Sequence, residues 1–96
     1  MDIGSIVKLK KITDKDTSGL LGILGVCYRW FKRGNTTVFS VIFETGGYTD
    51  FDGETADEFL DEVGFCAEVC NYEYTTEVRL ASDFRDGIFT PIFKGV

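Results

Sequence analysis

The stretch DFDGETADEFLDE, residues 50–62, places seven carboxylates in thirteen positions of a chain that contains no histidine. Carboxylates at this density can bind a divalent cation, act as an acid/base pair, or present a charged face to a basic partner. They can also be ordinary solvated surface. Which of these applies depends on the elements that carry the acids and on the groups beside them.

Catalysis has the weakest support. A general acid/base pair needs two carboxylates that face each other across a cleft, one of them with a pKa raised by apolar surroundings. No histidine is present to exchange protons near neutral pH, and no serine stands in a nucleophile motif. The glycines of GLLGILG are not followed by the Lys-Ser/Thr of a phosphate-binding loop. We therefore expect no catalytic residues and no cofactor.

A metal site is a third hypothesis, after the two binding hypotheses below. Asp50, Asp52 and Glu54 offer carboxylates at alternate positions. A calcium-binding EF-hand loop has glycine at its sixth position and glutamate at its twelfth. Counted from Asp50, this stretch has glycine at the fourth position and Asp61 at the twelfth. Only a non-standard divalent site would therefore fit.

The three cysteines, Cys27, Cys66 and Cys70, are an odd number that cannot form a complete disulfide framework. Cys66 and Cys70 have a C-x-x-x-C spacing, but a zinc site there would need carboxylates to complete its ligands. Free cysteine is among the most buried residue types. We expect three buried or half-buried thiols.

The second half of the acidic stretch has the pattern of a short helix near residues 56–63. Thr55 followed by Glu58 is the signature of a capping box. Gly64 stands where a left-handed C-terminal cap belongs. The apolar stripe of this helix consists of Ala56, Phe59, Leu60 and Val63.

An acidic face is the principal functional prediction. On such a helix Asp57 and Asp61, and likewise Glu58 and Glu62, are like-charged i,i+4 pairs, which are mildly destabilising. No lysine between residues 44 and 78 compensates them. An electrostatic match to a basic protein surface would explain the clustering, as in phage-type antidefence or DNA-mimic proteins that inhibit nucleic-acid-binding proteins. The predicted partner-binding residues are Asp50, Asp52, Asp57, Glu58, Asp61 and Glu62.

The basic residues suggest an alternative. Residues 1–33 have a net charge of +4 and residues 34–96 a net charge of −10, within a total of −6. Basic side chains interleaved with aromatic ones can form a platform on which nucleic-acid bases stack. A pI near 4.5 argues against nucleic acid as the partner. The residues of this alternative are Lys8, Lys10, Arg29, Trp30, Lys32 and Arg33.

The remaining pattern predicts a mainly β fold with one short helix, formed by residues 1–96 as a single domain. A polar loop is expected at 13–22, and tight turns at Gly34 and Asn35 and at the following TGGY. A small, partly open antiparallel barrel closes such a sheet. The expected strands are 5–12, 23–33, 38–44, 48–52, 70–80 and a last strand within 83–93.

Residues 3–52 resemble the small barrels of KOW-type and Src-homology-3-like domains, on the segments IGSIVKLKK, GLLGILGVCYRW and TTVFSVIFETGGY. The resemblance implies a small barrel that binds nucleic acid or protein. The insertion ITDKDTSGLL at 12–21, the predicted helix and the C-terminal strands depart from this pattern. No apolar run approaches the roughly 18 residues of a membrane helix, and the N-terminus lacks the pattern of a signal peptide. We expect a cytoplasmic location and no membrane partner.

Overall fold

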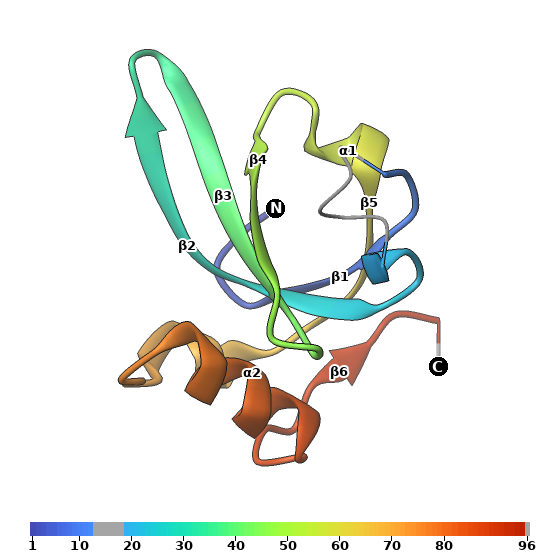
Figure 1. The fold of residues 1–96 in the computed structure, drawn as a ribbon, viewed down its shortest axis with the longest axis vertical. Helices are drawn as coiled ribbons and strands as arrows, with labels where there is room; N and C mark the ends of the chain where they lie inside the picture. Colours follow the sequence, from blue (N-terminus) through green and yellow to red (C-terminus); the bar gives the residue numbers. More distant parts are fainter. Residues whose placement is uncertain (13–18, 96) are drawn as a thin grey trace.

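The computed structural model describes residues 1–12 and 19–95. Six strands form one antiparallel sheet in the order β4-β3-β2-β1-β5-β6 (Figure 1). The predicted mainly β, small and partly open fold is therefore confirmed. Most of the loop predicted at 13–22 lies outside the described residues. The strands are β1 (Ser5–Leu9), β2 (Leu24–Arg33), β3 (Thr36–Phe43), β4 (Tyr48–Asp52), β5 (Leu60–Phe65) and β6 (Ile92–Phe93).

The strand β2 belongs to two parts of the sheet. Its residues 24–26 pair with β1, whereas residues 29–33 pair only with β3. The register shifts between Cys27 and Arg29, which leaves Tyr28 as an extra residue. Because a bulge bends a strand and increases its twist, β2 can curl the sheet around its core.

Both predicted hairpin turns are present. Gly34, with φ of 62°, lies between β2 and β3, and Gly46, with φ of 96°, lies between β3 and β4. Glycine has no Cβ and therefore adopts this left-handed conformation without steric cost.

Two apolar clusters pack against opposite faces of the sheet. The first lies on the inner side of the curl and is closed by the helix α1 (Ala56–Phe59). The second lies under the 3₁₀ helix η2 (Ala67–Asn71) and the helix α2 (Glu77–Arg85). In Figure 1, α2 lies below the curled sheet. The first cluster includes Val7, Leu9, Cys27, Val41, Phe43, Phe51 and Leu60; the second includes Ile6, Val26, Ile42, Cys66, Leu80 and Phe84.

The prediction of a strand at 70–80 is wrong. The alternating side chains of this segment lie in η2, in an irregular stretch and in the first turn of α2. The hydroxyl of Thr76 accepts a hydrogen bond from the Arg79 N–H at 3.1 Å and so caps α2. The buried Leu80, Ala81 and Phe84 then form one face of that helix.

The helix predicted near 56–63 is shorter than expected. It ends at Phe59, and Leu60 begins β5, which pairs with β1. The Thr55 hydroxyl makes no capping hydrogen bond. The Thr55 backbone carbonyl accepts a hydrogen bond from the Glu58 N–H at 3.0 Å. Gly64 is no helix cap, because it pairs with Ile6 and with Phe93 inside the sheet. Pairing with β1 has overridden the local helical pattern.

Candidate interaction surfaces

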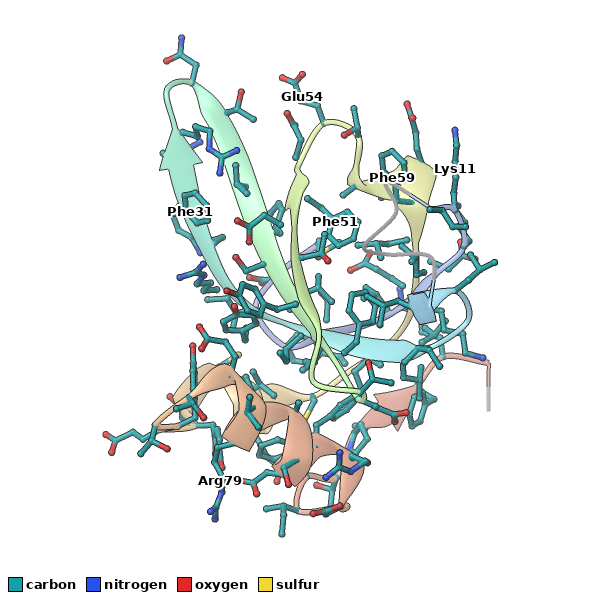
Figure 2. All side chains as sticks on the ribbon, viewed as in Figure 1. Lys11, Phe31, Phe51, Glu54, Phe59 and Arg79 are labelled. Atoms are coloured by element: carbon teal, nitrogen blue, oxygen red, sulfur yellow. The ribbon has the colours of Figure 1, made fainter. Side chains whose placement is uncertain are left out.

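The six acids of the principal prediction are all exposed, but they do not share a helix face. Asp50 and Asp52 lie on β4, while Asp57 and Glu58 lie on α1. Asp61 and Glu62 lie on β5, where successive side chains point to opposite faces. The predicted i,i+4 pairs on one helix face are therefore not formed. Figure 2 shows the side chains of the described residues, where Glu54 marks the turn between β4 and α1.

Asp61 and Glu62 have positive partners contributed by the N-terminal segment. The Lys10 ammonium lies 3.0 Å from the Asp61 carboxylate, and the N-terminal ammonium lies 3.9 Å from that of Glu62. Lys8 is the residue directly opposite Asp61 in the sheet. Residues 44–78 contain no lysine, but the N-terminal segment brings positive charges to Asp61 and Glu62 because β1 pairs with β5.

Asp50 is joined to the basic side of the molecule by a buried serine. The Ser40 hydroxyl donates to the Asp50 carboxylate at 2.6 Å, and the Arg29 Nε–H donates to the Ser40 hydroxyl at 2.9 Å. Ser40 is 0% exposed. Arg29, from the alternative prediction, and Asp50, from the principal one, therefore share one chain of hydrogen bonds across β2, β3 and β4.

Of the seven acids in residues 50–62, four exposed ones remain, which we call the acidic corner: Asp52, Glu54, Asp57 and Glu58. The Asp52 carboxylate accepts the Glu54 N–H at 2.8 Å and orders the turn. The Phe59 and Phe51 rings, 6.3 Å apart, pack α1 against β4. Among residues 1–12 and 19–95, none of the four carboxylates has a basic side chain within ion-pair distance.

The acids at the start of this surface are not arranged as a metal site. Within the described part of the chain, no group of three or more Cys, Asp or Glu side chains is placed to hold a metal ion. Asp50, Asp52 and Glu54 therefore do not form such a group. Asp50 and Asp52 instead accept hydrogen bonds from Ser40 and from the Glu54 backbone.

The residues of the alternative prediction fall into two groups. Lys8 lies on β1 and Lys10 immediately after it, where Lys10 pairs with Asp61. The other four lie together on residues 29–33 of β2, which pair with β3 but not with β1 and which we call the free half of β2. With Phe31 they form what we call the basic ribbon: Arg29, Trp30, Phe31, Lys32 and Arg33.

Cation–π contacts order the outer side of the basic ribbon. The Arg29 guanidinium lies 5.6 Å from the Tyr28 ring centre and 5.5 Å from that of Phe31. The Arg33 guanidinium lies 5.6 Å from the Phe31 ring centre. Two cations therefore hold Phe31 between them.

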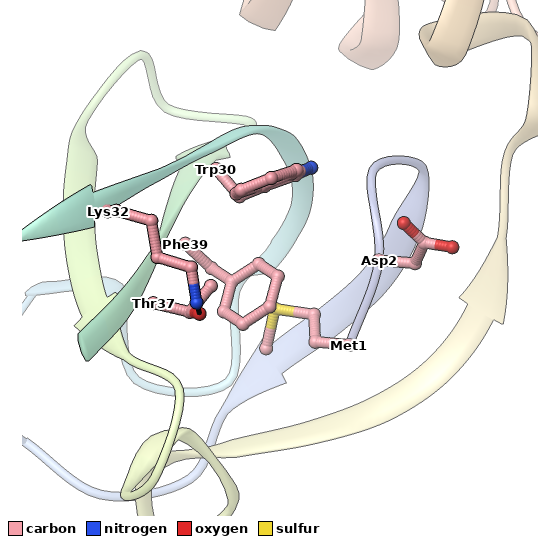
Figure 3. Close-up of a pocket in the computed structure, with 6 residues that line it drawn as sticks. All are labelled: Met1, Asp2, Trp30, Lys32, Thr37 and Phe39. Atoms are coloured by element: carbon pink, nitrogen blue, oxygen red, sulfur yellow. Dashed lines mark hydrogen bonds between the residues drawn. The ribbon is translucent and has the colours of Figure 1, made fainter. Parts of the chain in front are cut away.

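A shallow groove of about 250 Å³ lies on the inner side of the basic ribbon (Figure 3). Trp30, 51% exposed, forms one wall, and the Lys32 ammonium donates to the Thr37 hydroxyl at 2.6 Å. Trp30 is opposite Phe39 in the sheet, and Lys32 is opposite Thr37. Cross-strand pairing from the predicted hairpin turn could therefore have identified Phe39 and Thr37 as neighbours of the basic ribbon. No sequence signal indicated the rest of the lining. The groove is lined by Met1, Asp2, Trp30, Lys32, Thr37 and Phe39.

The thiols are free, as predicted, but Cys70 is exposed. Burial raises the pKa of Cys27 to about 12 and also raises the pKa of Cys66. Because the thiolate is the nucleophile, both buried thiols are held in the unreactive form. The Cys70 thiol donates to the Ile3 carbonyl at 3.3 Å.

Comparison of the chain with protein-family models, with curated proteins and with solved structures found no match. In the described ranges, no helix has the length and apolar character needed to cross a membrane.

Proposed function

We propose that this protein acts by binding rather than by catalysis, as an interaction or inhibitor domain that presents the acidic corner and Asp50 to a basic partner. One contrast supports this proposal. The carboxylates of Asp61, Glu62, Asp83 and Asp86 each lie within ion-pair distance of a positive group. Those of the acidic corner, like those of Asp2 and Glu73, have no such neighbour within the described residues, but the corner gathers four of them within residues 52–58.

Charge complementarity gives this surface a physical use. A cluster of like charges attracts an oppositely charged surface and speeds association at low ionic strength. Asp50 and Asp52 are alternate residues of β4, so they stand about 6.6 Å apart along one side of the strand. A row of this kind suits a protein surface that otherwise binds the phosphates of nucleic acid. A phage-type antidefence or DNA-mimic protein would belong to this class.

The likeness of residues 3–52 to KOW-type and Src-homology-3-like barrels forms part of the same proposal. The bulge in β2 and the curled antiparallel sheet agree with such a barrel (Figure 1). Similar domains bind protein or nucleic acid, which is compatible with a binding role.

Affinity capture from a lysate of the producing or host cells, quantified by mass spectrometry, tests the acidic corner. The variant Asp52→Asn, Glu54→Gln, Asp57→Asn, Glu58→Gln should lose one defined basic protein that the native chain captures. A matched variant removes the same charge elsewhere: Asp61→Asn, Glu62→Gln, Glu73→Gln, Asp86→Asn. It should retain the partner. Equal loss with both variants, or undiminished capture by the first, would contradict the proposal.

The alternative, a nucleic-acid-binding module, now depends on the basic ribbon. Trp30 is the single tryptophan, so its fluorescence reports on this surface directly. Titration with a single-stranded oligonucleotide should leave the fluorescence unchanged under the proposed function. Quenching that Arg29→Glu and Arg33→Glu abolish would favour the alternative.

A further inference from the structure

The free half of β2 has an open backbone edge. The strand β1 pairs only with residues 24–26 of β2, and the Gly4 N–H donates to the Cys27 carbonyl at 2.8 Å. Beyond Cys27, no strand of the described residues pairs with this edge. Figure 1 shows this half of β2 with β3 along one edge and no described strand along the other.

Sheet geometry identifies the backbone groups on that edge. The Gly53 N–H donates to the Thr37 carbonyl at 2.8 Å, so the backbone groups of Thr37 point toward β4. Because these directions alternate along a strand, those of Thr36, Val38 and Ser40 point toward β2. On β2, Trp30 and Lys32 are opposite Phe39 and Thr37 and therefore direct their N–H and C=O groups outward.

The side chains around this edge favour an acidic segment. Three of the five residues of the basic ribbon are cationic. Lysine and arginine on an open edge repel strands that are also basic, and such charges protect edge strands from aggregation. The same charges attract a strand that carries carboxylates. On the inner side, the groove between Trp30, Phe39 and Met1 can receive one apolar side chain.

We propose that the open edge of β2 binds an extended acidic peptide by strand addition. Backbone hydrogen bonds to Trp30 and Lys32 would hold the peptide, and its carboxylates would face Arg29 and Arg33. An apolar side chain of the peptide would enter the groove beside Trp30. This surface is distinct from the acidic corner and opposite to it in charge, so the proposal goes beyond the function proposed above.

Nucleic acid fits this edge less well. Arg29 already lies over the Tyr28 and Phe31 rings, and Arg33 lies over Phe31, which occupies ring faces that bases would need. A phosphate backbone also has no N–H groups to donate to the outward carbonyls of Trp30 and Lys32. The acidic edge strand β4 of a second copy would be a different occupant; its contact with β2 would join unlike surfaces head to tail and would make the oligomeric state depend on concentration.

The probe is a capped peptide in which glutamate and valine alternate, with a lysine-for-glutamate peptide as control. Amide hydrogen exchange of the full chain, followed by NMR, provides the readout. Without peptide, the amides of Trp30 and Lys32 should exchange quickly, whereas those of Phe31 and Arg33 should be protected. Saturating acidic peptide should slow exchange at Trp30 and Lys32 by at least about tenfold, and the control peptide should not.

Two substitutions separate the backbone from the charge. Lys32→Gln removes the ammonium and keeps the outward N–H; it should weaken peptide binding by about two- to fivefold. Lys32→Pro also removes the N–H, without removing a hydrogen bond to β3, and should weaken binding at least about tenfold further. Equal affinities for the two variants would overturn strand addition.

N-methylated peptides keep the proposal testable if Lys32→Pro fails to fold. N-methyl groups on the alternate amides that face β2 should abolish binding, while methylation of the intervening amides should be tolerated. Equal effects of the two methylation patterns would contradict the proposal.

Three further outcomes would also overturn the inference. The first is binding of a single-stranded oligonucleotide at these residues without binding of the peptide. The second is protection of the Trp30 and Lys32 amides that rises with protein concentration alone, which would identify a second copy as the occupant. The third is loss of peptide binding in the acidic-corner variant. If that variant binds the peptide normally, the two proposals succeed or fail independently.

Discussion

At the scale of a single residue, Ser40 connects Asp50, one of the predicted acidic residues, to Arg29, one of the predicted basic residues. Its buried hydroxyl donates to Asp50 and accepts from Arg29, so both charged side chains are held in fixed positions on the outer face of the sheet. A substitution at Asp50 or Arg29 therefore also alters how the other side chain is held.

We expect Ser40→Ala to lower the free energy of unfolding by about 1 kcal/mol, the usual net value of a hydrogen bond, because it removes both contacts. In an Asp50→Ala background the same substitution should cost less, since the carboxylate that receives the Ser40 hydroxyl is gone. Urea denaturation of the four proteins in this cycle measures the coupling. Purely additive losses would contradict the proposed network.

The three thiols should differ in reactivity. A thiol reagent at pH 8 should modify Cys70 rapidly, while Cys27 and Cys66 should react only after denaturation, because burial keeps both protonated and inaccessible. Peptide mapping of the labelled protein identifies the modified residues. Rapid native labelling of Cys27 would be inconsistent with the inner cluster described above.

At the scale of elements, residues 60–65 decide the shape of the acidic surface. Their sequence fits a helix, but as β5 they bridge β1 and β6 and carry Asp61 to Lys10. A Cβ at Gly64 would lie 2.5 Å from the Ile92 carbonyl oxygen. The absence of a side chain at this position is therefore a requirement of strand pairing rather than of helix capping.

Gly64→Ala should lower the free energy of unfolding by about 2 kcal/mol, because the added methyl group forces β5 and β6 apart. Gly47→Ala is the control, since its Cβ would meet only Leu20 at an ordinary 3.7 Å. Urea denaturation should show a change within about 0.5 kcal/mol for that variant. Equal tolerance of both substitutions would be incompatible with the β5–β6 pairing.

At the scale of the whole molecule, folding redistributes the charge asymmetry of the sequence. The basic N-terminal segment neutralises the acids of β5, and the acidic corner retains its charge at one end of β4. Repulsion within that corner should be screened by salt.

Raising NaCl from about 20 mM to about 500 mM should therefore raise the melting temperature by about 2–4 °C. The acidic-corner variant defined above should show little or none of this rise, because it lacks the repelling charges. Differential scanning fluorimetry measures both. The proposal of an uncompensated corner would fail if salt lowered the melting temperature of the native chain and its variant alike.

The strands β1 to β4 and their two glycine turns were predictable, because apolar alternation and positive-φ glycines are local signals. The exposure of the six acids was also predictable, because ionised carboxylates are rarely buried. The exposure of Trp30 was not, because the bulge at Tyr28 moves Trp30 to the face opposite the one that simple alternation gives it. The lengths of α1 and β5 and the existence of α2 were not, since Leu60 and the tyrosine-rich segment fit either helix or strand until a neighbouring element pairs with them.

By itself the sequence determined a mainly β domain with its charges divided between the two ends of the chain. Only the tertiary structure decided which charges remain uncompensated, because Lys10 and Asp61, or Arg29 and Asp50, are far apart in sequence and meet through strand pairing. The open edge of β2 likewise depends on where β1 stops pairing. Register and pairing are long-range properties, and no local pattern of side chains specifies them.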